Sequence, residues 1–351
     1  MIKYLGSKRV LVPVLGDLVT ASGARTALDL FTGTTRVAQE MCRRGLAHVT
    51  AVDTATYSEV LAACYVELDA ATVDPDEVAD ALAHLASLPP VRGYVTETFC
   101  ERARYFHPRN GVRIDAVRQG IDDHYGDHPL RAVLLTSLLE AADAVDSTVG
   151  VQMAYLKQWA PRALGELRLR VPVLTPGTGR AVRADASEVL GSLPHVDLAY
   201  LDPPYNQHRY FTNYHVWETL VRWDAPSTYG VACKRIDSRD AQTRSPFNRK
   251  REMPAALAQT VKAVDADVVV VSLSDEGFVP LDGLVRMGEA RGEAVRVLAF
   301  DSRRYVGARI GVYNPRGERV GEVSHTRNTE YVLLCGPQDS VAAMAEAVQP
   351  T

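Results

Sequence analysis

The apolar run Val196-Asp197-Leu198-Ala199-Tyr200-Leu201 ends in Asp202-Pro203-Pro204-Tyr205. The run is typical of a buried strand, and the two prolines that follow it stiffen the next loop. At the carboxyl edge of a sheet, this loop would present the Asp202 carboxylate, the Pro203 carbonyl and the Tyr205 ring on one side. Such groups can hold a flat ring that bears an amine, by stacking on it and accepting its hydrogen bonds. We therefore expect a nucleobase site at this loop.

A second strand end lies near the amino terminus. Thr26–Phe31 predicts a strand, residues 32–35 (Thr-Gly-Thr-Thr) a tight turn, Arg36–Gly45 a helix and Ala47–Val52 another strand. This order is a βαβ unit, and such sheets bind ligands at the first strand-to-helix turn. Asp53 closes the second strand, where a carboxylate can accept hydrogen bonds from two ribose hydroxyls.

The first turn lacks the further glycines of a pyrophosphate-binding loop, because Thr34 and Thr35 stand in their place. A pyrophosphate needs open backbone amides at the helix start, whereas a nucleoside without phosphates does not. Gly33 still allows a ligand to approach the backbone closely. The turn therefore favours S-adenosylmethionine over NAD. The residues expected to contact this cofactor are Asp29, Phe31, Gly33, Thr34 and Asp53.

Helical and strand patterns divide the chain. Residues 56–179 carry helical spacings, whereas strand patterns return after residue 180. These later strands are predicted at Ala181–Ala184, Val196–Leu201, Asp267–Leu273, Ala294–Phe300 and Glu330–Cys335, with a hairpin at 309–323. We therefore expect an α/β fold with a doubly wound, Rossmann-like sheet. Its catalytic domain would be formed by residues 1–55 and 180–351, and the mainly helical insertion 56–179 would recognise the target.

Positive charge gathers in one stretch, although the net charge of the chain is -4. Between residues 231 and 251, seven basic residues accompany only two acidic ones. We expect this stretch to contact phosphates; the simpler alternative is a solvated surface loop. Tyr210 and Phe211 are candidates to face a base, since aromatic rings stack on bases. The basic candidates are Lys234, Arg235, Arg239, Arg244, Arg249, Lys250 and Arg251.

Composition excludes several other classes. The five cysteines are scattered without paired spacing, so we expect neither a metal site nor a disulfide framework. The first residues lack the apolar core of a signal peptide, and no apolar run approaches the length of a membrane span. We therefore expect a cytoplasmic, nucleoid-associated protein without a membrane partner.

Taken in this order, the turn at 29–33 and the motif at 202–205 resemble adenine-specific DNA methyltransferases, in the branch that includes the Dam enzymes. Asp185 and Ala186 resemble the family position that meets the adenine of the cofactor. Residues 268–277 resemble the strand and turn after the catalytic motif. Residues 3–8 resemble the family's amino-terminal K-[WY]-x-G-G-K, which implies that Lys3, Tyr4, Gly6 and Lys8 line the cofactor pocket. Ser7 and Thr35 replace family glycines.

The resemblance implies methyl transfer from S-adenosylmethionine, which becomes S-adenosylhomocysteine, to the N6 amine of an adenine flipped out of double-stranded DNA. It assigns Asp202, Pro203, Pro204 and Tyr205 to catalysis. The expected assembly is a monomer or weak dimer, and a separate restriction nuclease is a conceivable partner. Alternatives are the amine of cytosine, a base in RNA, a DNA-binding regulator without turnover and a nicotinamide oxidoreductase. The sequence does not reveal which DNA sequence is recognised. Residues 324–328 are one candidate to contact the base edges.

Overall fold

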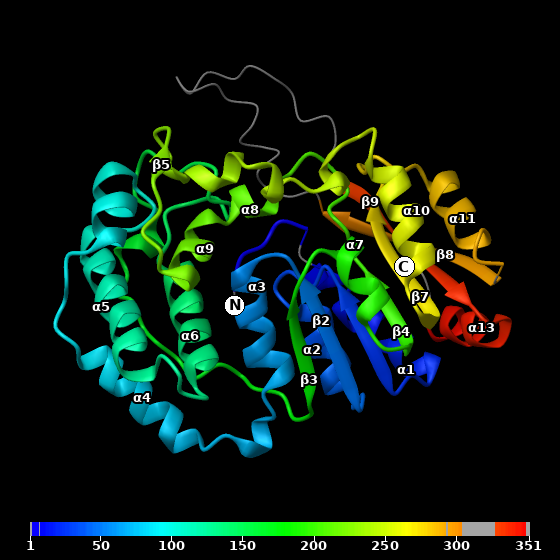
Figure 1. The fold of residues 1–351 in the computed structure, drawn as a ribbon, viewed down its shortest axis with the longest axis horizontal. Helices are drawn as coiled ribbons and strands as arrows, with labels where there is room; N and C mark the ends of the chain where they lie inside the picture. Colours follow the sequence, from blue (N-terminus) through cyan, green and yellow to red (C-terminus); the bar gives the residue numbers. More distant parts are fainter. Residues whose placement is uncertain (1, 7, 293, 304–326, 349–351) are drawn as a thin grey trace.

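The computed structural model describes residues 2–6, 8–292, 294–303 and 327–348 (Figure 1). Within these ranges a seven-stranded sheet has the order β3-β2-β1-β4-β7-β9-β8, and β9 alone runs opposite to the other six strands. The predicted doubly wound α/β fold is confirmed, and the strand predicted at residues 196–201 matches residue for residue. The strands are β1 (Thr26–Leu30), β2 (His48–Asp53), β3 (Gly179–Arg183), β4 (Val196–Leu201), β7 (Ala266–Ser274), β8 (Ala294–Arg303) and β9 (Arg327–Gly336).

Helices cover both faces of the sheet, and each face has its own buried apolar cluster. One face packs on α1 (Val12–Ser22), α2 (Arg36–Arg43), α3 (Thr56–Ala62) and α13 (Gln338–Ala347). The other packs on α7 (Ala186–Val189), α10 (Met253–Ala263) and α11 (Leu281–Glu289). The sequence patterns predicted α2 but did not reveal α1, α10 or α11. None of the helices in the described ranges has the length and apolar character of a membrane span.

The segment predicted as a helical insertion is helical. It contains α4 (Pro75–Ser87), α5 (Pro108–Tyr125) and α6 (Arg131–Ala144), and its α3 packs on β2 and β3 as the crossover helix of the sheet. The buried cluster of the first sheet face continues without a break into α5 and α6. The division into two domains therefore stays a prediction, and a boundary at residue 56 would separate α3 from the strands that it covers.

Two further elements follow the Pro-Pro-Tyr loop and lie beside the helical insertion (Figure 1). These are α8 (Tyr210–Asn213) and α9 (His215–Arg222), followed by the hairpin of β5 (Thr228–Tyr229) and β6 (Lys234–Arg235). The hairpin predicted at 309–323 lies outside the described residues, as do positions 324–326 of the candidate base reader.

The register of the parallel strands places several loops at one edge. Leu30 pairs with Val52 on one side and with Leu201 on the other, so β1, β2 and β4 end at the same level. The N–H groups of Phe31 and Thr32 donate to the carbonyl of Val52, and the N–H of Asp202 donates to that of Leu30. The loop after β1 and the loop after β4 are thereby joined by the backbone itself.

Substitutions of Trp217 test how strongly α9 packs against the helical insertion. Its side chain is fully buried, its ring lies 6.3 Å from that of Phe106, and its Nε1 has no hydrogen-bond partner among the described residues. Trp217→Ala should lower the free energy of unfolding by about 3–5 kcal/mol. Trp217→Phe should cost clearly less, because it keeps most of the apolar volume and removes an unpaired donor. Denaturant unfolding followed by circular dichroism measures both; equal losses would contradict this packing role.

Candidate active site

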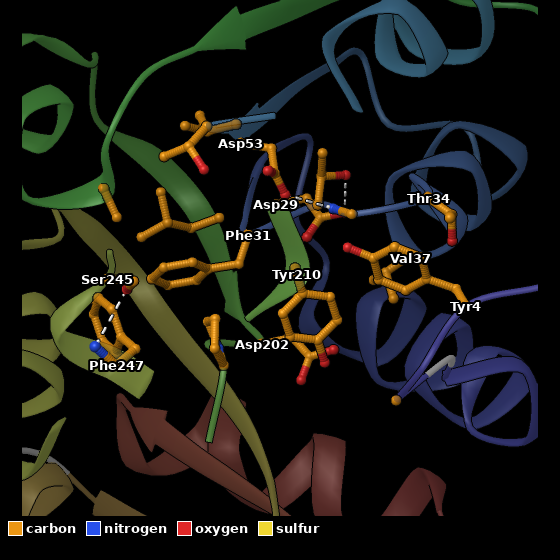
Figure 2. A pocket seen from close by; sticks show the side chains of 18 of the residues that line it. Tyr4, Asp29, Phe31, Thr34, Val37, Asp53, Asp202, Tyr210, Ser245 and Phe247 are labelled. Atoms are coloured by element: carbon orange, nitrogen blue, oxygen red, sulfur yellow. Dashed lines mark hydrogen bonds between the residues drawn. The ribbon is translucent and has the colours of Figure 1, made fainter. Parts of the chain in front are cut away.

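A pocket opens at the carboxyl ends of β1, β2 and β4 (Figure 2). It is lined by residues that were predicted from several separate stretches of the sequence. The predicted residues that line it are Tyr4, Gly6, Lys8, Asp29, Phe31, Gly33, Thr34, Asp53, Asp185, Ala186, Asp202, Pro204, Tyr210 and Phe211. The strand register therefore brings the candidate cofactor residues and the candidate catalytic loop into one cavity.

Asp53 and Gly33 shape one wall of the pocket. The Asp53 carboxylate accepts from the N–H of Gly33 at 2.9 Å and from that of Ala55 at 3.0 Å. Each oxygen keeps further acceptor capacity for a ligand hydroxyl. Gly33 has a φ of 53°, and a Cβ there would come within 3.1 Å of the Tyr4 ring. A side chain at this position would therefore be strained and would also crowd the pocket.

The turn after β1 is held from below by Asp29. Its buried carboxylate accepts from Thr32 Oγ1 at 2.8 Å and from the N–H of Ala38 at 3.1 Å. Burial raises the pKa of Asp29 to about 7, although these two donors oppose the rise. Phe31 and Thr35 have positive φ values of 73° and 61°. Left-handed backbone at Thr35 explains why the resembling family has glycine there, since side chains are strained in that region.

The opposite wall of the pocket comes partly from the basic stretch. Thr243, Ser245, Phe247 and Asn248 line the pocket, and the rings of Phe31 and Phe247 meet edge-on with centroids 4.9 Å apart (Figure 2). All four residues belong to the stretch 231–251 that was predicted to contact phosphates, but Phe247 was not predicted as a site residue. An apolar side chain inside a basic run was the available signal, because such a residue needs a place to be buried.

The amino-terminal segment closes another side of the pocket. The Tyr4 ring stacks on Tyr214 with centroids 4.5 Å apart and on Tyr210 at 5.2 Å. The hydroxyl of Tyr214 also accepts from the N–H of Leu5. Tyr210 was predicted to face a base, and it is already stacked on one side by Tyr4. Ser7 lies outside the described residues.

Lys3 does not line the pocket, contrary to the expectation from the family motif. Its Nζ lies 2.9 Å from Asp143 Oδ2 and 3.3 Å from Asp146 Oδ1, at the end of α6. Its backbone N–H donates to Asp143 as well. Lys3 therefore anchors the amino-terminal segment to the helical insertion, where it is the nearer cation for the buried Asp143, while Asp146 also pairs with Arg162 at 2.6 Å.

Asp202 sits among charged neighbours at the floor of the pocket. Its Oδ1 lies 3.1 Å from Lys8 Nζ and accepts from Ser272 Oγ at 3.1 Å. Burial raises the pKa of Asp202 to about 6, and the Lys8 ammonium limits that rise. Burial opposes the charge of Lys8 in turn, but Asp202 and Glu330 outweigh it and keep the pKa of Lys8 well above its usual value. Neither Ser272 nor Glu330 was predicted from the sequence as a site residue.

Pro203 and Tyr205 are not among the pocket-lining residues but lie directly beside them. The Tyr205 ring centroid is 5.6 Å from Lys8 Nζ, and the Tyr205 carbonyl accepts from the N–H of Phe278 at 2.9 Å. Pro203 is buried, and Tyr205 is partly exposed. The loop is thus fixed between the turn after β7 and the amino-terminal segment.

The predicted phosphate contacts separate into two groups. Arg235 is fully buried, and its guanidinium lies within 2.8 Å of both Asp224 and Asp237. The prediction that Arg235 contacts nucleic acid is therefore wrong, because all of its charge is used inside the protein. Lys234 is half-buried. The exposed members are Arg239, which stacks on the Tyr229 ring at 3.9 Å, together with Arg244, Arg249, Lys250 and Arg251.

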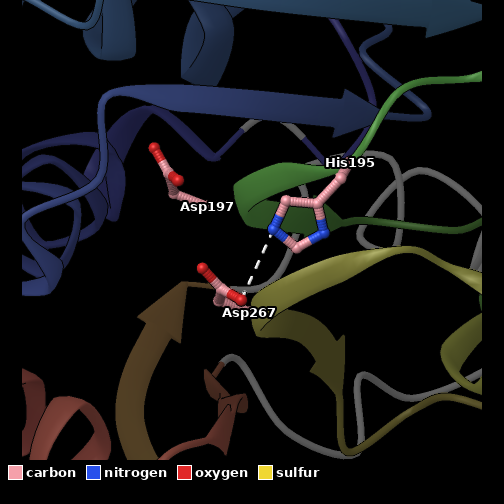
Figure 3. Close-up of side chains that lie close together, drawn as sticks. All are labelled: His195, Asp197 and Asp267. Carbon is pink, nitrogen blue, oxygen red and sulfur yellow. Dashed lines mark ion pairs between the residues drawn. The ribbon is translucent and has the colours of Figure 1, made fainter.

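A group of possible metal ligands lies at the other edge of the sheet. His195, Asp197 and Asp267 meet at the amino ends of β4 and β7 (Figure 3). His195 Nε2 lies 3.4 Å from Asp267 Oδ1, and Asp197 Oδ2 accepts from the N–H groups of Arg25 and Thr26. Ion pairs and backbone hydrogen bonds account for this arrangement. None of the three residues lines the pocket, which lies at the opposite edge of the sheet.

Comparison with known proteins identifies the class to which this site belongs. The family model of the D12 class N6 adenine-specific DNA methyltransferases matches residues 4–265. The chain belongs to this family, and it is an N6-adenine DNA methyltransferase.

Two curated relatives and one solved structure illustrate the similarity. Type II methyltransferase M.NlaIII of Neisseria lactamica is 30% identical over 268 residues, which cover 74% of this chain and 77% of that protein. Type II methyltransferase M.FokI of Planomicrobium okeanokoites is 31% identical over 215 residues, which cover 59% of this chain but only 32% of that protein. A precorrin-6y C5,15-methyltransferase structure from Geobacter metallireducens aligns with 95% of this chain and 90% of its own at 12% identity. The TM-score of this alignment is 0.28.

The buried position of Arg235 predicts an effect on stability. Arg235→Ala should lower the free energy of unfolding by about 2–3 kcal/mol, below the value for a fully buried pair, since Asp224 and Asp237 stay partly solvated and also pair with Arg222. Arg249→Ala is the matched control, because Arg249 pairs with Glu252 on the surface and should change stability by less than about 0.5 kcal/mol. Denaturant unfolding would refute the assignment if both variants behaved alike.

Proposed function

We propose that the pocket binds S-adenosylmethionine beside an adenine that has left the DNA duplex, and that Asp202 accepts from the N6 amine of this adenine. The observation that carries the proposal is that Asp202 and the turn at Phe31 and Gly33 line the same cavity. Methyl transfer requires the sulfonium carbon and the amine nitrogen within one site, because orientation supplies much of the acceleration.

The pocket wall suits a nucleoside that carries no phosphate. Asp53 closes β2 with acceptor capacity for the ribose hydroxyls, and Gly33 leaves room where a Cβ would project. Phe31, Phe247 and Ala186 offer apolar surface for the adenine ring of the cofactor. When bound, the cofactor supplies an electrophilic methyl group on a sulfonium. Asp185 lines the same wall, and its Oδ1 also accepts from the N–H of Ser187 at the start of α7.

Asp202 is proposed to act on the amine rather than on the methyl group. The lone pair of the aromatic amine is delocalised into the ring, so the amine is a weak nucleophile. Hydrogen bonds to the Asp202 carboxylate and the Pro203 carbonyl favour a tetrahedral nitrogen as charge develops. A sulfonium methyl held in line with this nitrogen would be transferred to it, and the amine would then lose one proton. Asp202 can receive this proton, since burial has raised its pKa to about 6.

The target adenine is inaccessible inside a duplex, so the base must be flipped out of the stack. Tyr205 is proposed to stack on the flipped base, with Tyr210 and Phe211, which line the pocket, beside it. Pro204 stiffens the loop that carries these groups. Double-stranded DNA is the proposed substrate, in the nucleoid. A cognate restriction nuclease is a further hypothesis, because the relatives are type II methyltransferases.

Asp202→Asn tests the proposed role of the carboxylate. The substitution keeps the size of the side chain but removes its charge and one acceptor, so kcat should fall by about 100- to 1,000-fold. Binding of S-adenosylmethionine, measured by calorimetry, should change little, because the groups on the β1 and β2 turns remain. Transfer of labelled methyl to duplex DNA, followed by nucleoside digestion, measures the rate. A variant with wild-type turnover would overturn the role of Asp202.

The exposed basic residues are proposed to position DNA through its phosphates. Arg244→Ala and Lys250→Ala should each weaken duplex binding similarly for all sequences and reduce the slope of log K against log salt by about one. Arg286→Ala is the control, since Arg286 lies on α11 and pairs with Asp282. Titrations at several salt concentrations measure the slope. Unchanged slopes in both variants would contradict the proposal and favour the alternative that residues 231–251 form a solvated surface loop.

A further inference from the structure

Three neighbouring strands contribute polar side chains to one face of the sheet beside Asp202. Asp202 follows β4, Ser272 lies on β7, and Glu330 lies on β9, and these strands are adjacent in the sheet. Side chains alternate along a strand, so Glu330 shares its face with the buried residues Val332 and Leu334. Ser272 shares the same face with Val268 and Val270. An acid and a hydroxyl are thus placed where the pattern otherwise puts apolar residues.

The Lys8 ammonium connects this group to the pocket. Its Nζ lies 3.0 Å from Glu330 Oε2 and 3.1 Å from Asp202 Oδ1. The Lys8 side chain is only 5% exposed, so neither contact is a surface ion pair of little worth. Ser272 Oγ donates to the same Oδ1 and contacts the Tyr200 hydroxyl at 2.7 Å. The contacts that Lys8 and Ser272 make with Asp202 at 3.1 Å thus both go to Oδ1.

We propose that Glu330 and Ser272 are positioning residues, which hold Lys8 and Asp202 so that Oδ2 of Asp202 points to the target amine. Glu330 acts through Lys8, and Ser272 acts on Asp202 directly. This inference rests on the proposed function, since it assumes that Asp202 accepts from the amine.

Charge balance gives Glu330 a second effect on the carboxylate. With Asp202 as its only partner, the ammonium would hold that carboxylate in a tight ion pair and weaken it as an acceptor. Glu330 shares the ammonium, so Asp202 keeps more of its basicity. The titratable groups that face Asp202 from the surrounding elements are Lys8, Asp29, Tyr200, Tyr205, Tyr210 and Glu330.

Glu330→Gln is the first test, with Ser272→Ala beside it. Each should lower kcat by about 10- to 100-fold, since small misplacements of a reacting group cost rate. The KM for S-adenosylmethionine should stay within about threefold, because neither residue lines the pocket. Asp282→Asn, on the exposed face of α11, is the control and should leave kcat unchanged.

The pH profile distinguishes positioning from general damage. Asp202 must be ionised to accept, so kcat/KM should fall as the pH drops through about 6. Glu330 raises the pKa of Asp202 and Ser272 lowers it. The acid limb should therefore move to lower pH in Glu330→Gln and to higher pH in Ser272→Ala. Limbs that stay in place, or that both move in the same direction, would overturn the proposal.

A double-mutant cycle tests whether Glu330 acts through Lys8. Lys8→Met leaves two carboxylates facing each other, so adding Glu330→Gln to it should restore part of the activity. A further loss equal to that of Glu330→Gln alone would overturn the proposal. If Glu330→Gln does not fold, as judged by circular dichroism and cofactor binding, the pH profile of Ser272→Ala is the test. An acid limb that does not move to higher pH in this variant would overturn the proposal.

The Asp202→Asn variant separates the two proposals. Full activity in Asp202→Asn would remove the proposed function and this inference together. An inactive Asp202→Asn beside a Glu330→Gln with wild-type kcat and pH profile would remove this inference only.

Discussion

The N–H of Asp202 donates to the carbonyl of Leu30, and the N–H groups of Phe31 and Thr32 donate to Val52. These bonds join the ends of three parallel strands at one level, although about 170 residues separate the first strand from the third. Ligands of such sheets bind at the carboxyl edge for this reason, because side chains from distant motifs meet there at fixed distances. The pocket, the acidic residue at or beside the end of each strand and the stiff Pro-Pro loop all depend on this register.

Burying several carboxylates at one edge of the sheet costs desolvation free energy, and neighbouring hydrogen-bond donors and an ammonium offset this cost. Asp29, Asp53 and Asp202 each have a raised pKa, and burial is the main cause in every case. Asp29 and Asp53 are compensated chiefly by backbone and hydroxyl donors, whereas Asp202 has an ammonium. An ammonium that is shared between two carboxylates leaves Asp202 able to accept a hydrogen bond from substrate. An ammonium paired with Asp202 alone would neutralise that carboxylate. Because Glu330 also pairs with Lys8, the ammonium stabilises the Asp202 carboxylate without forming an ion pair with Asp202 alone.

The helical insertion contributes to the pocket indirectly. Lys3 binds two carboxylates at the end of α6, and Tyr4 stacks on Tyr210 and Tyr214 near the start of α9. The amino-terminal segment is therefore held over the pocket from the side of the insertion. Contacts made by the insertion can thus affect the geometry of the pocket wall, since Tyr4 lines the pocket and also contacts Tyr57 of the insertion.

Local sequence determined the strand at residues 196–201, the βαβ unit near the amino terminus and the motifs that line the pocket, because periodicity and turn chemistry act over a few residues. Only the tertiary structure separated Arg235 from Arg249, two arginines of one basic run. The β5–β6 hairpin encloses the first beside Asp224 and Asp237, and the second stays in solvent. Glu330 and Ser272 carry no local signal either, since their roles arise from the insertion of β9 beside β7. Strand order fixes which distant side chains become neighbours, and strand order is a property of the whole chain.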